Sequence, residues 1–218
     1  MEIRRPSPYL IVFTLWLLVF SSASQTMIIA PILPQIGDQL GIPDAALGTL
    51  VSAYTLMVGV FAILSGPVSD KLGRRRILLL GCGTMTVALL LHGFVTGYTT
   101  FLAVRVFAGM AGGMLSGAAV SYIGDYFPYH RRGWATGWVM SGSAFGQVFG
   151  IPLGIVMADR WGFRSPFWIF TVTMTLTVLL LFFRVPQPDV KRTQHTLTVR
   201  KAAGDYVASA VAMSRSRW

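Results

Sequence analysis

The chain has 218 residues, of which 54% are hydrophobic and only 12% are charged. With a mean hydropathy of +0.62, the chain carries more apolar surface than one water-soluble core of this size can bury. The composition therefore indicates an integral protein of the lipid bilayer. The formal charge of +10 would suggest a nucleic-acid partner in a soluble chain. Here the cations lie in short polar segments and a tail, where topology and anionic lipid account for them, so no nucleic-acid partner is expected. The single cysteine, Cys82, provides neither a disulfide nor a metal site.

Six apolar runs are long enough to cross a bilayer as helices. We place these helices at residues 9–30, 47–69, 77–95, 99–124, 134–158 and 165–183. A secretory signal is the alternative for the first run, but that run stays apolar to Ala30 and further runs follow, which favours a retained anchor. Residues 1–183 are therefore predicted to form one all-α transmembrane unit, and residues 184–218 a basic cytoplasmic tail.

The lysines and arginines are distributed unequally between the two sides of this six-span arrangement. The side that holds both chain ends carries 15 of the 18, whereas the opposite side carries only Arg160 and Arg164. Short segments rich in lysine and arginine are retained in the cytoplasm. The sequence therefore predicts that both termini are cytoplasmic.

The segment between the second and third helices is predicted to be a tight, basic loop at the membrane surface. It reads Gly66-Pro-Val-Ser-Asp70-Lys71-Leu-Gly73-Arg74-Arg75-Arg76. Gly66 permits close helix approach, Gly73 permits a turn that other residues disfavour, and Asp70 can accept hydrogen bonds from a helix N-terminus or pair with an arginine. The alternative is a basic loop that sets the topology alone.

The spacing in this segment resembles the signature of the major facilitator superfamily between its second and third helices. The matching positions are Gly66, Asp70, Lys71, Gly73, Arg74 and Arg75. Residues 31–34 and 105–113 are similar to the drug and sugar efflux branch, and residues 161–168 to the family's entry into its sixth helix. The resemblance covers about residues 9–183, and it implies the N-terminal six-helix half of a twelve-helix fold.

The resemblance implies a secondary active transporter that exports a small molecule across a bacterial inner membrane by alternating access, with no cofactor and no enzymatic step. One half is expected to pair with a second six-helix half or with itself as a homodimer. The alternatives are a truncated product without transport and a membrane-embedded interaction subunit. The sequence shows no nucleophile and base pair, metal-ligand cluster or phosphate-binding loop.

Two further features of the family are implied for this chain. A 3+3 inverted repeat is supported by a similarity within the sequence. Asp70-Lys-Leu-Gly73-Arg74 resembles Asp159-Arg-Trp-Gly162-Phe-Arg164, which lies 89 residues later and on the opposite side of the membrane in the six-span arrangement. An inner gate is also implied, in which Asp70 and Arg74 or Arg75 meet Asp125 at the end of the fourth helix.

Arg105 is the one charge deep within a predicted span. Burying it in hydrocarbon costs about 2.5 kcal/mol or more, so it is expected to face a hydrated cavity together with Gly109 and Gly113 of the same helix. The alternative is that its side chain snorkels to the outer surface. Gln25 in the first helix either lines the same cavity or makes an ordinary hydrogen bond between helices.

Glycines recur every four residues in the fifth helix, at Gly142, Gly146, Gly150 and Gly154. They form a smooth stripe on which another helix can pack closely, and which serves either packing alone or a conformational hinge. The family's antiporter motif is matched in part by Gly137, Gly146, Gly150 and Gly154, with Ile151 where a proline is usual and Ile155 where a glycine is usual. These departures weaken the antiporter assignment more than the transporter assignment.

Overall fold

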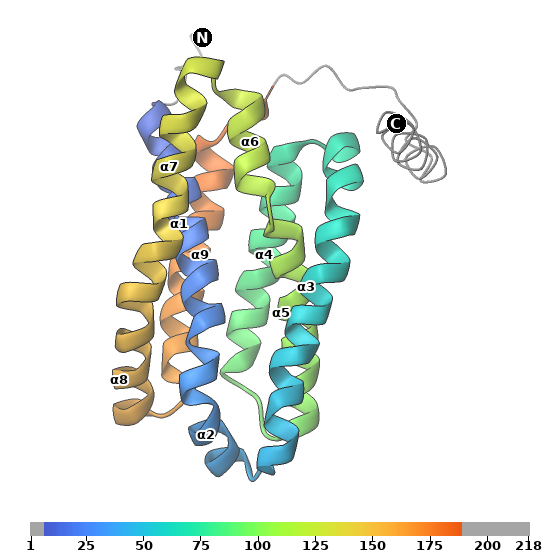
Figure 1. Cartoon of the computed structure of the whole chain (residues 1–218), viewed down its shortest axis with the longest axis vertical. Coiled ribbons are helices and arrows are strands. Elements are labelled where there is room, and N and C mark those ends of the chain that lie inside the picture. The colour runs from blue at the N-terminus through green and yellow to red at the C-terminus, as the bar shows by residue number, and fades with distance from the viewer. Residues whose placement is uncertain (1–6, 189–218) are drawn as a thin grey trace, which may run out of the picture.

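The computed structural model describes residues 7–188, and this part of the chain is helical with short connections (Figure 1). Its elements are α1 (Pro8–Met27), α2 (Ile29–Leu40), α3 (Asp44–Leu72), α4 (Arg74–His92), α5 (Tyr98–Leu115), α6 (Ala118–Tyr126), α7 (Tyr129–Phe145), a π-helical turn (Gly146–Gly150), α8 (Ile151–Trp161) and α9 (Ser165–Arg184).

Six helical rods are long and apolar enough to cross a membrane. They span Pro8–Met27, Asp44–Leu72, Arg74–His92, Tyr98–Tyr126, Tyr129–Trp161 and Ser165–Arg184. The rods run up and down, so the α3–α4 and α6–α7 connections lie at the end of the bundle that holds the start of α1, and the α2–α3, α4–α5 and α8–α9 connections lie at the opposite end (Figure 1). The expected all-α, six-span architecture is confirmed.

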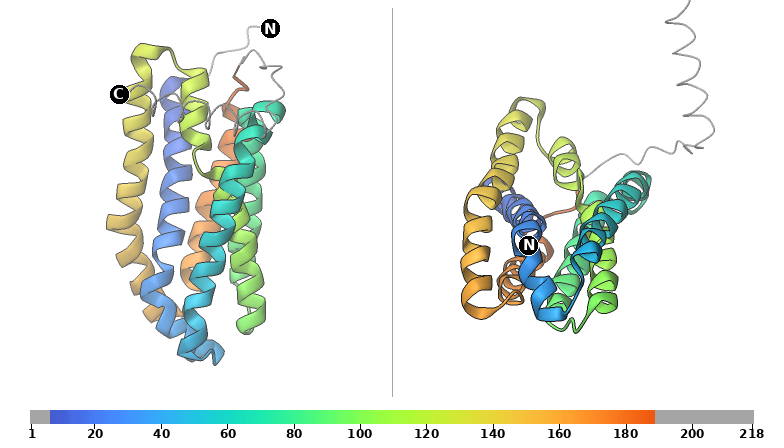
Figure 2. Two further views of the ribbon diagram at one scale, coloured as in Figure 1. Left: turned by 45° about the vertical axis from the view of Figure 1, so that its right-hand side comes forward. Right: turned by 60° about the horizontal axis from the view of Figure 1, so that its bottom comes forward.

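The rods pack in a regular pattern of pairs. α3 lies along α5, α1 lies along α7, and α4 lies along α9, while α4 also contacts α5 and α1 also contacts α9. Figure 2 shows α3 to α5 as one group and α1 with α7 to α9 as the other. The two groups therefore meet chiefly where α4 packs against α9.

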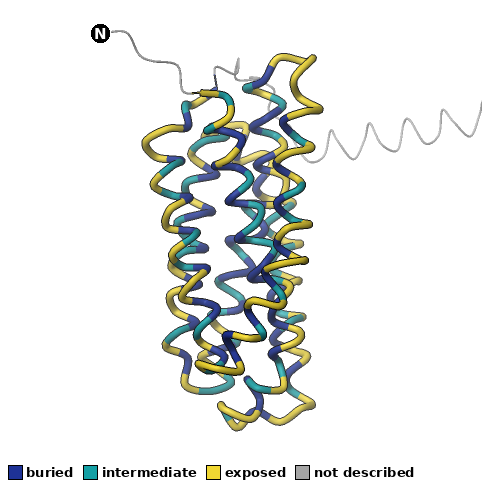
Figure 3. The backbone as a smooth tube through the Cα atoms, turned by 90° about the vertical axis from the view of Figure 1, so that its left-hand side faces the viewer, coloured by how far each residue is buried: buried dark blue, intermediate teal, exposed yellow. Residues whose placement is uncertain are grey.

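The outward faces of the rods are apolar as well as the inward faces. Buried residues lie along the inner sides of the tube in Figure 3, and exposed residues along the outer sides. Exposed positions include Ile63 of α3 and Val172 of α9, at 78% and 69% exposure. Such surfaces are stable in lipid, where the backbone is satisfied within each helix and the surrounding solvent is itself apolar.

The predicted basic loop at residues 66–76 is wrong in its extent. Helix α3 continues through Pro67 to Leu72, and α4 begins at Arg74, so Gly73 alone separates the two helices. Gly73 has a φ of 98° and its amide donates to the carbonyl of Ser69. A glycine can adopt this conformation without a Cβ penalty, and a single residue therefore makes the whole turn.

Three predicted helices prove to be interrupted. The first, expected at 9–30, breaks at Ile28 and continues as α2 to Leu40, because Pro31 and Pro34 lack amide donors for the preceding turn. The fourth, expected at 99–124, breaks at Ser116 and Gly117, whose φ is 73°. The fifth, expected at 134–158, begins at Tyr129 and contains the π-helical turn, so residues 129–132 are helical rather than loop.

The other elements lie close to their expected positions. The helices expected at 47–69, 77–95 and 165–183 are observed as α3, α4 and α9, each beginning or ending a few residues away from the expected bounds. After α9, Tyr122 donates a hydrogen bond of 2.7 Å to the carbonyl of Pro186. Most of the expected tail, residues 189–218, lies outside the described residues.

Candidate functional site

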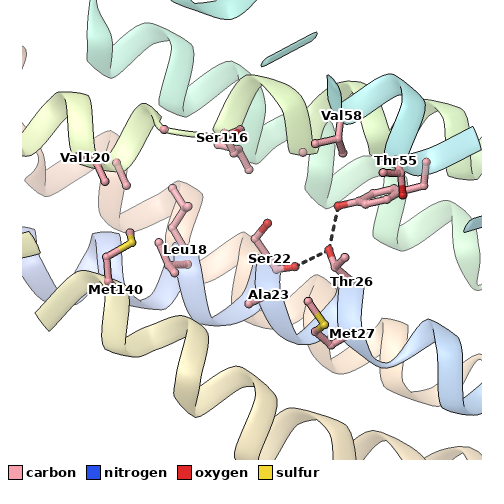
Figure 4. A pocket seen from close by; sticks show the side chains of 16 residues that line it. Leu18, Ser22, Ala23, Thr26, Met27, Thr55, Val58, Ser116, Val120 and Met140 are labelled. Carbon is pink, nitrogen blue, oxygen red and sulfur yellow. Dashed lines mark hydrogen bonds between the residues drawn. The ribbon is translucent and has the colours of Figure 1, made fainter. Parts of the chain in front are cut away.

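A cavity of about 390 Å³ opens among α1, α3, α5, α6 and α7. Most of the side chains around it are apolar. Its polar groups are hydroxyls, contributed by Ser22, Thr26, Tyr54, Thr55 and Ser116. Figure 4 shows Ser22 and Thr26 from α1 facing Thr55 from α3 and Ser116 from the break after α5 across the same space. The arrangement suits a small, largely apolar molecule oriented by a few hydrogen bonds.

Tyr54 links this cavity to the buried polar residues behind it. Its hydroxyl lies 2.9 Å from Thr26 Oγ1 and accepts a 3.1 Å hydrogen bond from Gln25 Nε2. Thr26 Oγ1 in turn donates to the carbonyl of Ser22. Gln25 is fully buried, and its Oε1 has no hydrogen-bond partner within residues 7–188. The tyrosine therefore joins α1 to α3 at the cavity wall.

Arg105 lies on the other side of Tyr54. Its guanidinium carbon is 4.2 Å from the centre of the Tyr54 ring, a cation–π contact. Arg105 Nε donates a 3.4 Å hydrogen bond to the carbonyl of Leu50, and NH1 has no partner in the described part of the chain. The residue is 1% exposed, so its side chain does not reach the outer surface by snorkelling.

The expected cavity residues are placed one layer away from the cavity. Gln25 and Arg105 do not line it, because Tyr54 and Thr26 stand between them and the open space. Gly109 and Gly113 do not line it either; a Cβ at Gly113 would lie 2.6 Å from the carbonyl oxygen of Val58. These glycines allow the α5 and α3 backbones to approach closely.

The glycine stripe of the fifth rod contacts α1. A Cβ added at Gly142 would lie 2.7 Å from the carbonyl oxygen of Trp16, and at Gly146 3.0 Å from that of Phe20. Gly150 likewise faces Ser24 of α1, and Gly154 faces Ile28, the residue between α1 and α2. The stripe thus packs as expected, and the π-helical turn from Gly146 to Gly150 lies at its centre.

Charged residues lie close together where α3 and α6 end and α4 begins. Arg74 forms ion pairs of 2.7 Å with both Asp70 and Asp125, and donates a 3.0 Å hydrogen bond to Ser69. Arg75 instead donates to the carbonyl of Phe182 in the last turn of α9, at 2.6 Å. Gly66 and Lys71 are exposed on α3. Of the two arginines considered for the expected cluster, Arg74 is the one that joins the acids.

We expect Arg74→Gln to loosen α6 more than Arg76→Gln does. Arg74 holds two carboxylates that repel each other once it is removed, whereas Arg76 is exposed and forms no ion pair in the described residues. A loss of about 1 kcal/mol is expected for this partly buried network. Hydrogen exchange in residues 118–126, measured by mass spectrometry in detergent, should be about five-fold faster in Arg74→Gln than in wild type. Equal exchange in the two variants would contradict a structural role for the cluster.

Sequence reasoning missed Tyr54, Ser116 and Gly117. Tyr54 lies in an apolar run where an aromatic residue is unremarkable, so only the helix contacts show that its hydroxyl is bonded. The pair Ser116-Gly117 carries the one available signal, since a glycine beside a serine in a long helix suggests a break.

Comparison with known proteins identifies the family. The model of the Major Facilitator Superfamily matches residues 15–213. The multidrug resistance protein MdtG of Salmonella typhi is 31% identical over 173 residues, which cover 77% of this chain and 43% of that protein. An uncharacterized MFS-type transporter of Bacillus subtilis (strain 168), YwfA, is 29% identical over 163 residues, which cover 75% of this chain and 40% of that protein.

The fold agrees with solved structures. The crystal structure of a D-xylose-proton symporter has a TM-score of 0.74 at 18% identity, covering 93% of this chain and 53% of that one. The chain spans 40% to 43% of the length of the two curated relatives. Because the family model matches most of its length, and the fold is shared, the chain belongs to the Major Facilitator Superfamily, a family of transporters rather than enzymes.

Proposed function

We propose that this chain forms one half of a secondary active transporter that exports small, largely apolar molecules by alternating access. The observation that carries the proposal is the cavity among α1, α3, α5, α6 and α7, with its apolar wall and few hydroxyls. Efflux is favoured over uptake because several of the relatives are named multidrug resistance proteins.

A second six-helix half is part of this proposal. The chain spans less than half the length of the two curated relatives, and the cavity is open rather than enclosed by the described helices. A substrate path that is separated from lipid needs further helices to cover the open side of this cavity, as a second wall. We propose that another half, or a second copy of this chain, supplies that wall, and that the substrate passes between the two.

Packing supports a 3+3 inverted repeat within the chain. Such a repeat relates the first rod to the fourth, the second to the fifth and the third to the sixth. The contact of α1 with α7 then corresponds to the contact of α5 with α3, and the contact of α4 with α9 corresponds to itself. Gly73 and Gly162 both end a helix with positive φ, three residues after an aspartate. Arg75 donates to Phe182 near the end of α9, and Arg164 donates to Val95 just after α4. These contacts correspond under the same exchange.

We further propose that the end of the bundle with Arg74 faces the cytoplasm, following the bias of its cations. Asp44 and Lys71 are exposed at opposite ends, and Cys82 is buried, so single-cysteine variants can be made in a Cys82→Ala background. An impermeant maleimide should label Asp44→Cys in intact cells, and Lys71→Cys only after permeabilisation. The reverse pattern would show the opposite orientation.

The ion pairs of Arg74 with Asp70 and Asp125 support a gating role in a complete transporter. They join the ends of α3 and α6 to the start of α4, at the proposed cytoplasmic end. Asp70 is half exposed, with 52% of its side chain accessible, and is thus available to a second half as well. Opening toward the cytoplasm would then require these contacts to separate.

Dye export tests the proposal. Cells that lack their own multidrug exporters are given the chain alone, or the chain with a second six-helix half, and the retention of an apolar fluorescent dye is measured. We expect lower retention only where two halves associate, either this chain with the supplied second half or this chain with a second copy of itself. Ser116→Trp, which fills the cavity, should abolish export, while Ser52→Trp on the exposed side of α3 should not.

Two results would count against the proposal. Export by the chain as a monomer would contradict the need for a second wall. Unchanged retention, with both halves inserted and associated, would contradict export of apolar molecules and favour a membrane-embedded interaction subunit instead.

A further inference from the structure

A second hollow lies between α1 and α7, at the end of the bundle where α1 begins. It encloses about 440 Å³ and is lined by Tyr9, Val12, Phe13, Trp16, Trp134 and Trp138. The hollow shares no lining residue with the central cavity. Phe13 and Trp138 are about half exposed, at 49% and 57%, so the described helices leave this aromatic surface uncovered.

The aromatic side chains continue along both helices as one stack. The rings of Phe13 and Trp16 lie 6.2 Å apart at 13°, and those of Trp16 and Phe20 lie 5.3 Å apart at 6°. Phe145 of α7 meets Trp16 edge-on at 5.8 Å. From Tyr9 to Phe20 the helix rises about 17 Å. This length matches the acyl region of one leaflet, which is about 15 Å thick.

A cation lies at the end of this surface. Arg131 precedes Trp134 and Trp138 by three and seven residues on α7, and therefore shares their helix face. Its side chain is exposed and forms no hydrogen bond or ion pair with the residues that the structure describes. Its neighbour Arg132 differs, because it donates to the carbonyl of Phe127 and lies over the ring of Tyr129.

Within residues 7–188, the two helices that form this surface bring no opposing charge to it. Neither α1 nor α7 contains an acidic residue, and Asp125, just before α7, is paired with Arg74. The indoles of Trp134 and Trp138 lie within the first three turns of α7, next to the membrane surface, where tryptophan rings commonly meet the headgroup region. An apolar surface one leaflet deep, with a guanidinium at its membrane-surface end that pairs with no described residue, complements an anionic phospholipid.

We propose that an anionic phospholipid binds in this groove, with one acyl chain along the Phe13–Trp16–Phe20 stack and its phosphate on Arg131. The guanidinium offers a planar fork of donors that suits phosphate oxygens. The acyl chain contacts α1 and α7 together, so the bound lipid holds these two helices to each other. The site is independent of the transported substrate, because it lies outside the central cavity.

Quenching of tryptophan fluorescence by brominated lipid tests the site. The whole chain is reconstituted in vesicles of phosphatidylcholine with rising fractions of dibromo-phosphatidylglycerol, and, in the reciprocal series, dibromo-phosphatidylcholine in phosphatidylglycerol. We expect wild type to prefer phosphatidylglycerol about five-fold, as one cation near the surface provides. Arg131→Gln should lower this preference to about one, and Arg131→Lys should retain part of it.

Two controls make the result specific. Arg76→Gln removes an exposed cation from the same end of the bundle but from a different helix, and should keep the five-fold preference. Trp138→Ala should reduce quenching by both lipids, because it removes part of the acyl surface together with a tryptophan that reports on the groove. Thermal unfolding of each variant in detergent should match wild type, since Arg131 and Trp138 are exposed.

Three outcomes would overturn the proposal. Equal quenching by the two lipids in wild type would show ordinary boundary lipid. An unchanged preference in Arg131→Gln would place the anion elsewhere. Formation of a dimer that Trp138→Ala abolishes would show that a second copy of the chain, and not a lipid, covers the groove.

Discussion

Gly142→Ala should destabilise the six-helix bundle by about 2 kcal/mol, the cost of forcing an extra methyl group into a packed contact. The new Cβ would lie 2.7 Å from the carbonyl oxygen of Trp16 and 3.1 Å from the amide nitrogen of Phe20. Both are backbone atoms, so the strain is relieved only if α7 moves away from α1. Thermal unfolding in mild detergent should show a lower midpoint for this variant.

Gly137→Ala is the matched control for this change. Gly137 lies on the same helix, and a Cβ there would meet no atom within 4 Å. Alanine is favoured over glycine in an exposed helical position by up to about 1 kcal/mol. The control should therefore unfold at the wild-type midpoint or above it. Equal midpoints for the two variants would contradict close packing of α7 on α1.

Arg105→Met should reduce export by the paired protein at least ten-fold, a loss of about 1.4 kcal/mol or more, while leaving the bundle as stable as wild type. Methionine is shorter than arginine but is flexible and of similar volume, so it occupies much of the space beside Tyr54 without a charge. Arg105 meets no carboxylate in the described residues, so its charge is buried without an ionic partner. Removing such a charge is often neutral or stabilising.

The loss of export follows from the position of Arg105 behind Tyr54. Its positive charge acts on the tyrosine that carries the cavity hydroxyl, and its Nε is bonded to the α3 backbone at Leu50. Arg105→Lys should restore export poorly, because an ammonium lacks the planar fork that stacks on the ring. Dye retention and thermal unfolding are measured on the same preparations.

Two results would contradict this role. Wild-type export by Arg105→Met would show that the charge is dispensable. A fall in the unfolding midpoint that accompanies the loss of export in both variants would show that Arg105 serves the packing of α3 on α5 and has no separate effect on transport.

The sequence by itself determined the number of spans and the family. Each apolar run is a local property of consecutive residues, and hydropathy over about 20 residues reports it directly. The signature at residues 66–75 is equally local, and it predicted the family that the comparisons confirm. The proximity of Asp70, an arginine and Asp125 was expected as well, because their helix ends lie on one side.

Helix interruptions were harder to predict because proline and glycine have more than one use in a membrane helix. Pro67 lies within α3 without ending it, whereas the prolines at 31 and 34 accompany a break at Ile28. Gly117 breaks a helix, while Gly142 packs against a neighbour in a continuous one. The residue type is the same in each pair, and the neighbouring helix decides the outcome.

Only the tertiary structure decided which polar residues face the cavity. Gln25 and Arg105 stand out in the sequence because they are polar within apolar runs, yet both lie behind Tyr54. Charge and polarity show that a buried group needs a partner, but they do not show from which direction the partner comes. That direction depends on the rotation of α1, α3 and α5 about their axes, which is fixed where glycines let two backbones meet.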